Sequence, residues 1–544
     1  MRAPPSLLVL LGLSLAACLP PSLAECTDPD CIPATTGETG DPSPPTTGDD
    51  PGVYTVTGDE PAPSSTGEPD PGATTGAPID PPAILDFDLD PNPIKINGLI
   101  DVTVTAEYAD GVRMQLDDGT EVELESRDPD IFTGSIPIFT GLLNGDHDAL
   151  LTPWQAPQFT GPTVPAPYTV QLPVPGSQIF WETGDLIGPG EVAALVTLPT
   201  GELVELGTHS PQGKPRCYLR RRDKGGAWGP DDIVDILPGI DCAAVDLQVD
   251  EFGALYVLVN RQGQDGLRWW VAKISSWGLG AKNLGTGSEG ETATALAAHP
   301  SGDLAVCGFA PTPVPEPDDD AMVWLFRPNQ PGETLALDYL NGIFKPHWFS
   351  ERTRDCTYSG DTLVLVGEAN AKHENDLNRD RLFIASVDPI TKSAAWTIAP
   401  PGAKTTQSSA QTMTIDDQER ILVAGYVCGD DCDPEGELRI YDPDGTLVWF
   451  ASLGAFPTPQ WTARDIAWSP AKYIVVATGG ITGKESSFSV RAFAPFKYDP
   501  LWTFTREDSQ VLNSANALAI GVFGQVYAGG FGANGYPAVA YIAG

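Results

Sequence analysis

One short phrase recurs between residue 176 and the C-terminus, and it constrains the fold more than any other feature of the chain. Each copy is a turn, a short apolar run and a glycine. The clearest copies are at 302–308, 360–367, 420–425 and 524–530. Successive copies lie about 50 to 60 residues apart. Internal repetition at this period is typical of a solenoid or a β-propeller.

Aligning the repeats on the closing glycine divides this region into seven units. A four-stranded blade with its loops fits such an interval. Before most runs lies a short strand rich in alanine, as at 293–297 and 515–519. Small side chains suit the crowded centre of a ring of blades, so we predict a seven-bladed propeller over residues 176–544. The aligned positions are Gly207, Val259 in place of glycine, Gly308, Gly367, Gly425, Gly479 and Gly529.

The two ends of the propeller region predict how the ring closes. The last repeat reaches the C-terminus soon after its third strand, 538–542, and has no tryptophan strand of its own. The segment 179–183, which contains Trp181, resembles the fourth strands at 447–451 and 501–504. We therefore expect the first strand of the region to complete the last blade as a latch. Closure of this kind removes the exposed strand edge.

An acidic turn followed by a tryptophan marks the fourth strand of several units. Asp388 leads to Trp396, and Asp442 leads to Trp449. These phrases resemble the repeats of quinoprotein-like and WD40-like β-propellers. We expect Trp396, Trp449 and Trp502 to pack between blades, where each buries a large apolar area. No cofactor is predicted.

Residues 84–175 have the pattern of a second all-β unit. Apolar and polar residues alternate at 85–89, 100–106 and 121–124, as in half-buried strands. Asp117 to Gly119 is a hairpin signal between two such runs. Some seven short strands fit an immunoglobulin-like β-sandwich. The segment resembles bacterial Ig-like domains, although it contains no cysteine.

Residues 18–83 have the composition of a tether. No Lys or Arg occurs between Arg2 and Lys95, and small Thr-Gly-acid phrases repeat throughout. Such a segment cannot bury enough apolar surface to offset the entropy of ordering. We predict a disordered, self-repelling spacer. It resembles the spacers of myxobacterial surface lipoproteins.

The N-terminus carries an export signal. Arg2 precedes a short apolar stretch at 6–15, which is followed by Leu-Ala-Ala-Cys18. This phrase resembles a bacterial lipobox, which implies that residues 1–17 are a signal peptide and that Cys18 becomes the lipid anchor. Leu19 in place of an acid favours the outer membrane or cell surface. The alternative is ordinary cleavage after Ala24, which releases a soluble protein.

The chain has nine cysteines, so eight are left when Cys18 is set aside. An even number in an exported protein indicates disulfides. The repeat alignment favours two short loops and two bridges between neighbouring blades. Zinc is the alternative for the pair in the fifth unit, which lacks a nearby histidine. The expected pairs are Cys26 with Cys31, Cys428 with Cys432, Cys217 with Cys242, and Cys307 with Cys356.

No motif predicts a catalytic or metal residue. The five histidines have no metal-ligand spacing, and no Gly-x-Ser-x-Gly elbow occurs. A Ser/His/Asp triad is an alternative that the sequence does not exclude, because its residues come together only in the fold. The phrase 146–148, with one histidine between two acids, is expected to be a solvated loop. Acidic stretches at 318–320 and 430–433 are also expected to be solvated loops, with Ca²⁺ as the alternative. The phrase 442–445 resembles a sialidase Asp-box but is interpreted as a hairpin turn.

A net charge of −42 makes nucleic acid an unsuitable partner. We expect a monomeric, exported, lipid-anchored surface protein whose propeller binds protein or carbohydrate. One alternative is an extracellular polymer-degrading enzyme with carboxylates in the central cleft, and another is an outer-membrane assembly lipoprotein. Converging carboxylates with raised pKa at the channel would favour the enzyme. A lining of only Ala, Ser and Thr would exclude it.

Overall fold

The structure is a computed structural model of the 544-residue chain. It describes residues 80 to 544 with short gaps, so the predicted signal peptide and tether lie outside the described residues. The gaps are 96–97, 117–118, 120, 139–143, 157–158, 184–187, 223–227, 251, 264–265, 275–280, 312–318, 328–332, 337–347, 372–378, 392, 399–406, 429–434, 454–460, 481–486, 508–512 and 533–534.

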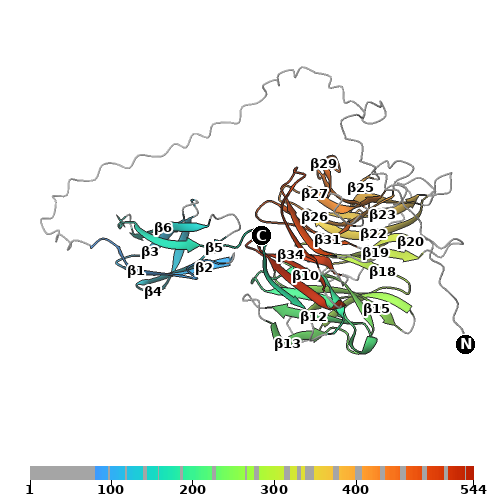
Figure 1. The fold of residues 1–544 in the computed structure, drawn as a ribbon, viewed down its shortest axis with the longest axis horizontal. Helices are drawn as coiled ribbons and strands as arrows, with labels where there is room; N and C mark the ends of the chain where they lie inside the picture. The colour runs from blue at the N-terminus through green and yellow to red at the C-terminus, as the bar shows by residue number, and fades with distance from the viewer. Residues whose placement is uncertain are drawn as a thin grey trace, which may run out of the picture. The chain divides into compact units, whose positions relative to one another are not determined.

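The described chain is built from β-strands, as predicted. A single 3₁₀ turn, η1 (Pro211–Gly213), is the one helical element among the described residues. Within the same residues, no helix has the length and apolar character needed to cross a bilayer. The strands form two bodies, a β-sandwich and a β-propeller (Figure 1).

The sandwich has two groups of strands in the order β1-β2-β5-β4 and β3-β6-β8. In a seven-stranded immunoglobulin sandwich the two sheets have the strand orders ABED and CFG, and the observed order is the same. Strand β4 pairs with both β5 and β3, and the two-residue β7 is an addition beside β6. The strands are β1 (Ala83–Asp90), β2 (Gly98–Glu107), β3 (Gly111–Gln115), β4 (Glu121–Asp128), β5 (Ile131–Ile138), β6 (Gly145–Gln155), β7 (Phe159–Thr160) and β8 (Val164–Val170).

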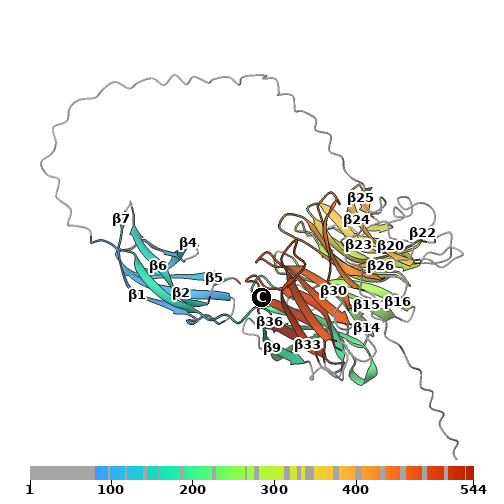
Figure 2. The same ribbon diagram turned by 45° about the horizontal axis from the view of Figure 1, so that its top comes forward.

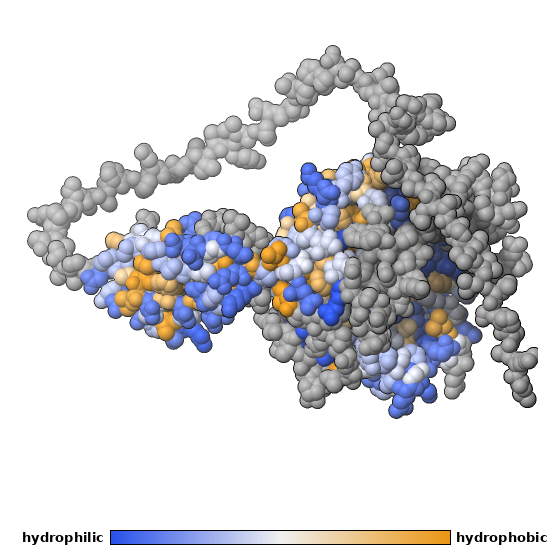
Figure 3. All heavy atoms as spheres, viewed as in Figure 1, coloured by the Kyte–Doolittle hydropathy of each residue, from blue (hydrophilic) through white to orange (hydrophobic). Residues whose placement is uncertain are grey.

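The alternating pattern in these strands produces a single buried core. Val102, Val104, Phe132 and Leu151 are almost completely buried, while residues of opposite parity face solvent. Hydrophilic and hydrophobic residues are interspersed on the face of this body seen in Figure 3. The sequence predicted a solvated loop at 146–148, and this prediction is wrong. His147 is part of strand β6, and its ring stacks on Tyr168.

The propeller has seven four-stranded blades of antiparallel strands, and in blades 1 to 6 the strands follow chain order. Figure 2 shows these strands from a second direction. A single pairing between Gly479 and Ser514 joins the last two blades into one hydrogen-bonded sheet. Blades 1 to 3 are β10 (Gly190–Thr197), β11 (Leu203–His209), β12 (Arg216–Arg222), β13 (Trp228–Asp235); β14 (Cys242–Val249), β15 (Leu255–Gly263), β16 (Gly266–Ile274), β17 (Ala281–Thr286); and β18 (Thr292–Ala298), β19 (Leu304–Pro311), β20 (Asp319–Phe326), β21 (Glu333–Ala336). Blades 4 to 6 are β22 (Trp348–Ser359), β23 (Thr362–Ala371), β24 (Arg379–Asp388), β25 (Ser393–Ile398); β26 (Gln407–Ile415), β27 (Ile421–Cys428), β28 (Glu435–Tyr441), β29 (Leu447–Ser452); and β30 (Trp461–Trp468), β31 (Ile474–Gly480), β32 (Ser487–Phe493), β33 (Pro500–Glu507).

The seventh blade combines the two ends of the propeller region, as predicted. Strands β34 (Ser514–Ile520), β35 (Val526–Phe531) and β36 (Pro537–Ile542) are followed in space by β9 (Gln178–Thr183). Strand β9 pairs antiparallel with β36, with Trp181 opposite Ala540. Figure 1 shows β34 beside β10, where the last blade meets the first. The outer strand of blade 7 therefore comes from before blade 1, and the ring has no open edge.

The recurring glycine has a structural cause in the inner strand of each blade. All seven inner strands have a register shift at the same place, a β-bulge that leaves one extra residue unpaired. A Cβ at Gly308 would lie 2.0 Å from the carbonyl oxygen of Thr292, just before the bulge, and a Cβ at Gly425 would lie 2.0 Å from that of Ser409. This close approach explains the glycine where the second strand passes the bulge, although Val259 in blade 2 and Thr478 in blade 6 occupy the same place.

The register corrects the glycine alignment in two blades. Gly530 pairs with Ala515 and occupies the place predicted for Gly529. In blade 6 that place is taken by Thr478, one residue before Gly479. The apolar run in these blades ends in two adjacent small residues, so the sequence alone does not distinguish the register.

Two disulfides connect neighbouring blades, as predicted. Cys217 on β12 is bonded to Cys242 at the start of β14, and Cys307 on β19 is bonded to Cys356 on β22. Cys428 is also disulfide-bonded. Disulfides persist in oxidising compartments, which agrees with export. Of the remaining predicted cysteines, Cys18, Cys26, Cys31 and Cys432 lie outside the described residues.

Two fourth-strand tryptophans pack against the next blade, as expected. The indole N–H of Trp396 donates a hydrogen bond of 3.0 Å to the carbonyl oxygen of Pro443 in blade 5. The Trp449 ring lies 6.4 Å and 5.6 Å from the rings of Phe496 and Tyr498 in blade 6, measured between centroids. These side chains fill the gap between outer strands and hold neighbouring blades together.

Trp502 lies in a core that blades 6 and 7 share. Its ring is edge-on to Tyr473 of its own blade, with centroids 6.2 Å apart. It packs against a cluster that includes Val475 of blade 6 and Val526 of blade 7. The third predicted tryptophan therefore also belongs to a junction between blades.

Candidate functional site

The inner strands of all seven blades surround a channel that holds a cavity of about 340 Å³. The residues that line it come from β10, β14, β18, β22, β26, β30 and β34. Each blade contributes its bulge residue, and blades 1 to 6 also contribute the residue that follows it, so the lining has two successive levels of side chain. In the channel, every blade presents side chains to a common space.

The deeper level contains an aspartate in every second blade. Asp246, Asp355 and Asp465 follow the bulges of blades 2, 4 and 6. Each carboxylate accepts a backbone N–H from its own strand and another from the inner strand of the next blade. The inter-blade donors are Leu296 N to Asp246 Oδ2 at 2.8 Å, Met413 N to Asp355 Oδ2 at 2.7 Å, and Leu518 N to Asp465 Oδ2 at 2.6 Å.

The blade between two of these aspartates connects them. The hydroxyl of Thr412 in blade 5 lies 3.1 Å from Asp355 Oδ2 and 3.2 Å from Asp465 Oδ1. These contacts occupy both oxygens of Asp355 and of Asp465. The arrangement is that of a structural clamp between blades, since each carboxylate satisfies inner-strand N–H groups that water cannot easily reach.

The three carboxyl groups have raised pKa values. Burial raises the pKa of Asp246 to about 8, and the charge of Asp355 adds to this effect. Burial likewise raises the pKa of Asp465 to about 7 and that of Asp355 to about 6. Carboxylates with raised pKa at the channel were the feature expected of an enzyme, and these three aspartates have it. However, each of them accepts hydrogen bonds from the inner strands of two blades.

The level formed by the bulge residues is divided into a polar and an apolar part. Blades 1 and 2 contribute Ala193 and Val245, and the other five blades contribute polar side chains. We call these five residues the polar arc. A bulge re-aims its extra residue, and bulges are common beside functional sites. The polar arc consists of Thr294, Arg354, Gln411, Arg464 and Asn516.

Two guanidinium groups in the polar arc are near enough to affect each other. Desolvation in the channel lowers the pKa of Arg464, the charge of Glu191 raises it, and the charge of Arg354 lowers it further. Arg354 forms an ion pair with the buried Glu368. Glu191 accepts a hydrogen bond of 3.1 Å from Asn516, and desolvation raises the pKa of Glu191.

The polar arc lies toward the face of the ring where the inner strands begin. On the opposite face, the first and second strands of a blade are joined by tight turns such as 198–202 and 416–420. The connections at the polar-arc face are longer, and several of them, including 312–318, 337–347 and 399–406, lie in gaps of the described chain. Binding residues of β-propellers and similar scaffolds are often carried by such connections.

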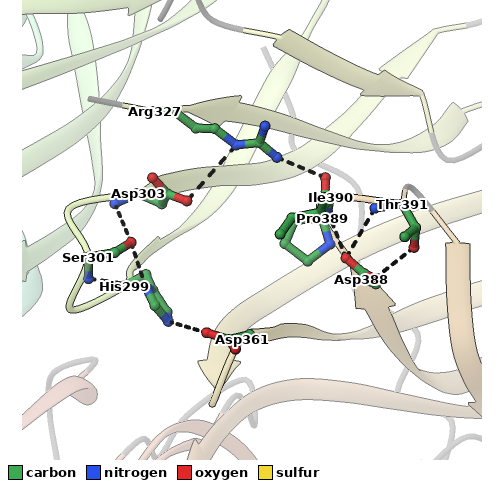
Figure 4. A network of polar contacts seen from close by, with 9 residues as sticks. All are labelled: His299, Ser301, Asp303, Arg327, Asp361, Asp388, Pro389, Ile390 and Thr391. Carbon is green, nitrogen blue, oxygen red and sulfur yellow. Dashed lines mark hydrogen bonds and ion pairs between the residues drawn. The ribbon is translucent and has the colours of Figure 1, made fainter. Parts of the chain in front are cut away.

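A Ser/His/Asp arrangement occurs on the opposite face, in the tight turns of blades 3 and 4 (Figure 4). Ser301 Oγ lies 2.7 Å from His299 Nδ1, and His299 Nε2 lies 3.6 Å from Asp361 Oδ1. However, His299 Nδ1 also accepts the backbone N–H of Ser301, and the Asp361 side chain is 96% exposed. The arrangement therefore shapes and connects turns.

The same network extends to the outer turn of blade 4. Arg327 approaches Asp303 at 4.0 Å and donates a hydrogen bond to the carbonyl oxygen of Pro389 (Figure 4). Asp388 accepts backbone N–H groups from Ile390 and Thr391. The Asp388 carboxylate thus stabilises the acidic turn before Trp396 through hydrogen bonds within the turn.

The acidic phrases of the sequence take structural roles where they are described. Asp319 lies at the start of β20 and not in a loop, and it forms an ion pair with Arg352 at 2.7 Å. The predicted hairpin turn at 442–445 is confirmed, with Gly445 N donating to Asp442 O. Residues 430–433 lie outside the described chain. Among the described residues, no group of three or more His, Cys, Asp or Glu side chains is arranged to hold a metal ion.

The sheet order and the channel define a seven-bladed β-propeller protein. No family model matches the chain, and no curated protein matches it. Solved structures that are similar to the chain include the Pan2 WD40 domain of Neurospora crassa, with 10% identity, a TM-score of 0.39, and coverage of 68% of this chain and 95% of that one. Sqt1 from Chaetomium thermophilum has 12% identity, a TM-score of 0.40, and coverage of 68% and 99%. A polysaccharide lyase, the PL25 ulvan lyase, has 11% identity, a TM-score of 0.41, and coverage of 68% and 96%. The assignment to the propeller class rests on the strand pairing.

Proposed function

We propose that the chain is an exported, lipid-anchored surface protein whose propeller is a binding module for carbohydrate or protein. The observation that carries the proposal is that the two levels of the channel have different roles. The aspartates of the deeper level are engaged in hydrogen bonds between blades, whereas the polar arc above them faces open space. In this proposal the polar arc binds the ligand, and the carboxylates below it stabilise the ring and take no part in catalysis.

The proposed lipid anchor and the proposed location at the cell surface rest on the N-terminal sequence. Cys18 is the proposed acylated residue, and the acidic segment after it provides reach from the membrane. A Cys18→Ser variant should leave the detergent phase in a two-phase partition experiment, because acyl chains provide the membrane affinity. Unchanged partition would contradict the anchor. Protease treatment of intact cells should cut the propeller if it is displayed outside, and a propeller that survives while other surface proteins are cut would contradict surface display.

The second candidate is an enzyme that cuts an extracellular polymer. The observation in its favour is the raised pKa of Asp246 and Asp465, since a protonated carboxyl group can act as a general acid. The binding proposal predicts retention of the full chain on a polysaccharide gel without the release of new reducing ends. Release of reducing ends that disappears in a folded Asp465→Asn variant would instead establish catalysis. Asp465→Asn is nearly isosteric, so the variant separates chemistry from gross loss of shape.

A further inference from the structure

We propose that the polar arc binds a sugar acid, with the carboxylate of the ligand held by Arg464 and Arg354 at the mouth of the channel. This inference rests on the proposed binding function and names the class of its ligand. The site is the polar-arc level of a cavity of about 340 Å³, which also extends past the three aspartates to Gln248, Thr357 and Thr414. The whole cavity is at the lower end of the usual size of ligand pockets, about 300–1,000 Å³. Such a volume suits one small unit better than an extended segment.

The guanidinium groups are the strongest indication of an anion. Arg464 is exposed in the channel, and within the described chain it makes no hydrogen bond to another residue. Arg354 pairs with Glu368, but its Nε is buried and has no hydrogen-bond partner among the described residues. Both side chains line one cavity, and a carboxylate can accept two N–H groups from a guanidinium at once. A bound carboxylate would therefore satisfy the guanidinium of Arg464, which the described chain leaves without a hydrogen bond, and reduce the repulsion between the two arginines.

The other members of the polar arc indicate a hydroxylated ligand. The amide groups of Gln411 and Asn516 can donate and accept hydrogen bonds, which is what sugar hydroxyls require. The hydroxyl of Thr294 donates to the carbonyl oxygen of Thr353 at 2.8 Å, so toward a ligand it can act only as an acceptor. Their positions are held by neighbours, since Asn516 donates to Glu191 at 3.1 Å and the Gln411 amide donates to Ser409. Rigid polar groups of this kind reduce the entropy lost on binding.

The opposite side of the ring fits the less polar face of the same ligand. The two bulge residues outside the polar arc, Ala193 and Val245, are small and apolar. A pyranose ring has a patch of C–H groups that can lie against such a surface. No aromatic residue is among the described residues that line the cavity, so hydrogen bonds and charge carry the recognition, and aromatic stacking does not.

The large negative charge of the chain limits the size of the ligand. A net charge of −42 repels a long polyanion. Charges more than about 8 Å away are largely screened at physiological salt, so the nearby charges decide the binding of a single acidic unit. These are Arg464 and Arg354, together with Glu191 near Arg464 and Glu368 paired with Arg354. The ligand is therefore a free sugar acid or the acidic end unit of a saccharide.

Calorimetric titration of the full chain with three probes tests the proposal. The probes are galacturonic acid, trigalacturonate and the neutral sugar galactose, each at 0.15 M salt. We expect binding of both acids and at least tenfold weaker binding of galactose. Equal affinity per site for the two acids indicates a free sugar acid, and tighter binding of trigalacturonate indicates a saccharide end, so either pattern supports the inference.

Two variants locate the binding in the channel. Arg464→Ala should weaken the binding of galacturonic acid at least tenfold, and Lys497→Ala, which removes the same charge from an exposed turn remote from the channel lining, should leave it unchanged. An Arg464→Ala variant with wild-type affinity would overturn the inference, and so would a wild-type chain that binds neither acid. If the chain is retained on neutral polysaccharide gels while both acids fail to bind, the ligand class is wrong and the binding function stands. If it is retained on no saccharide or protein partner, the proposed function fails as well.

Discussion

The carboxylate of Asp465 in blade 6 accepts the backbone N–H of Leu518 in blade 7 at 2.6 Å. Asp246 and Asp355 make the same contact from blades 2 and 4. These three contacts tie every second blade to the one that follows it, close to the axis of the ring. The inner strands therefore depend on side chains as well as on backbone pairing.

Replacing Asp465 by alanine should destabilise the propeller by about 2–4 kcal/mol, because it leaves the buried N–H of Leu518 without an acceptor and removes a contact between blades. Urea unfolding followed by circular dichroism measures the change. Asp499→Ala, at an exposed position of the same blade, is the matched control and should stay within about 0.5 kcal/mol of the wild type. Equal stability of the two variants would show that the contact does not hold the blades together.

The three aspartates also predict how stability depends on pH. Their pKa values are raised from 3.8 to about 8, 6 and 7 for Asp246, Asp355 and Asp465. The folded chain therefore keeps protons that the unfolded chain loses, so this contribution to stability is full below pH 3.8 and is lost as the pH rises through 6 to 8. Each retained proton changes the unfolding free energy by up to about 1.4 kcal/mol per pH unit. Unfolding curves at pH 5.5 and pH 8.5 should show the loss, and an Asp246→Asn variant should show a smaller one. A stability that rises across this interval would contradict the assignment.

In blade 3, the glycine that ends the apolar run is predicted to be needed for packing against the bulge. Gly308→Ala places a Cβ 2.0 Å from the carbonyl oxygen of Thr292, so the backbone must move, at a cost on the order of 1–3 kcal/mol. At Gly98, a Cβ would have no atom within 4 Å. Thermal unfolding should therefore show a lower midpoint for Gly308→Ala and little change for Gly98→Ala. An equal unfolding midpoint for both variants would contradict the explanation of the recurring glycine by the β-bulge.

The disulfide between Cys307 and Cys356 closes a loop across two blades, with a sequence separation of 49. Replacing both residues by serine should lower stability by about 2–4 kcal/mol, since the unfolded chain regains the freedom that the bond removes. The difference should disappear when wild type and variant are compared in a strong reductant. If it persists there, lost packing and not the bond accounts for the effect.

The blades and the latch could be predicted from the sequence because both depend on local patterns. The apolar runs, the turn before each of them and the tryptophan of the fourth strand repeat along the chain, and 179–183 has the pattern that the last unit lacks. The inter-blade disulfides followed once each cysteine had been placed on a strand. Where two small residues end a run, as at Thr478 and Gly479, the register could not be assigned.

The channel was harder to predict because its two levels appear only when the inner strands are superposed at the bulge. The phrases Val-Asp-Leu247, Asp-Cys356 and Asp-Ile466 place an acid before a buried residue in alternate blades. Aligning the seven inner strands by that buried residue would have found them. Arg354 and Arg464 had no such signal, since nothing in the sequence says that a bulge turns them toward one cavity.

The retention of the purified full chain in a native gel with galacturonic acid coupled to its matrix tests the role of the polar arc most directly. Wild type and Lys497→Ala should migrate more slowly than in a gel without saccharide, and no new reducing ends should form. Arg464→Ala should migrate at the same rate in both gels, because its guanidinium group is the donor that the described chain leaves open. Equal retardation of Arg464→Ala and the wild type would contradict binding at the mouth of the channel.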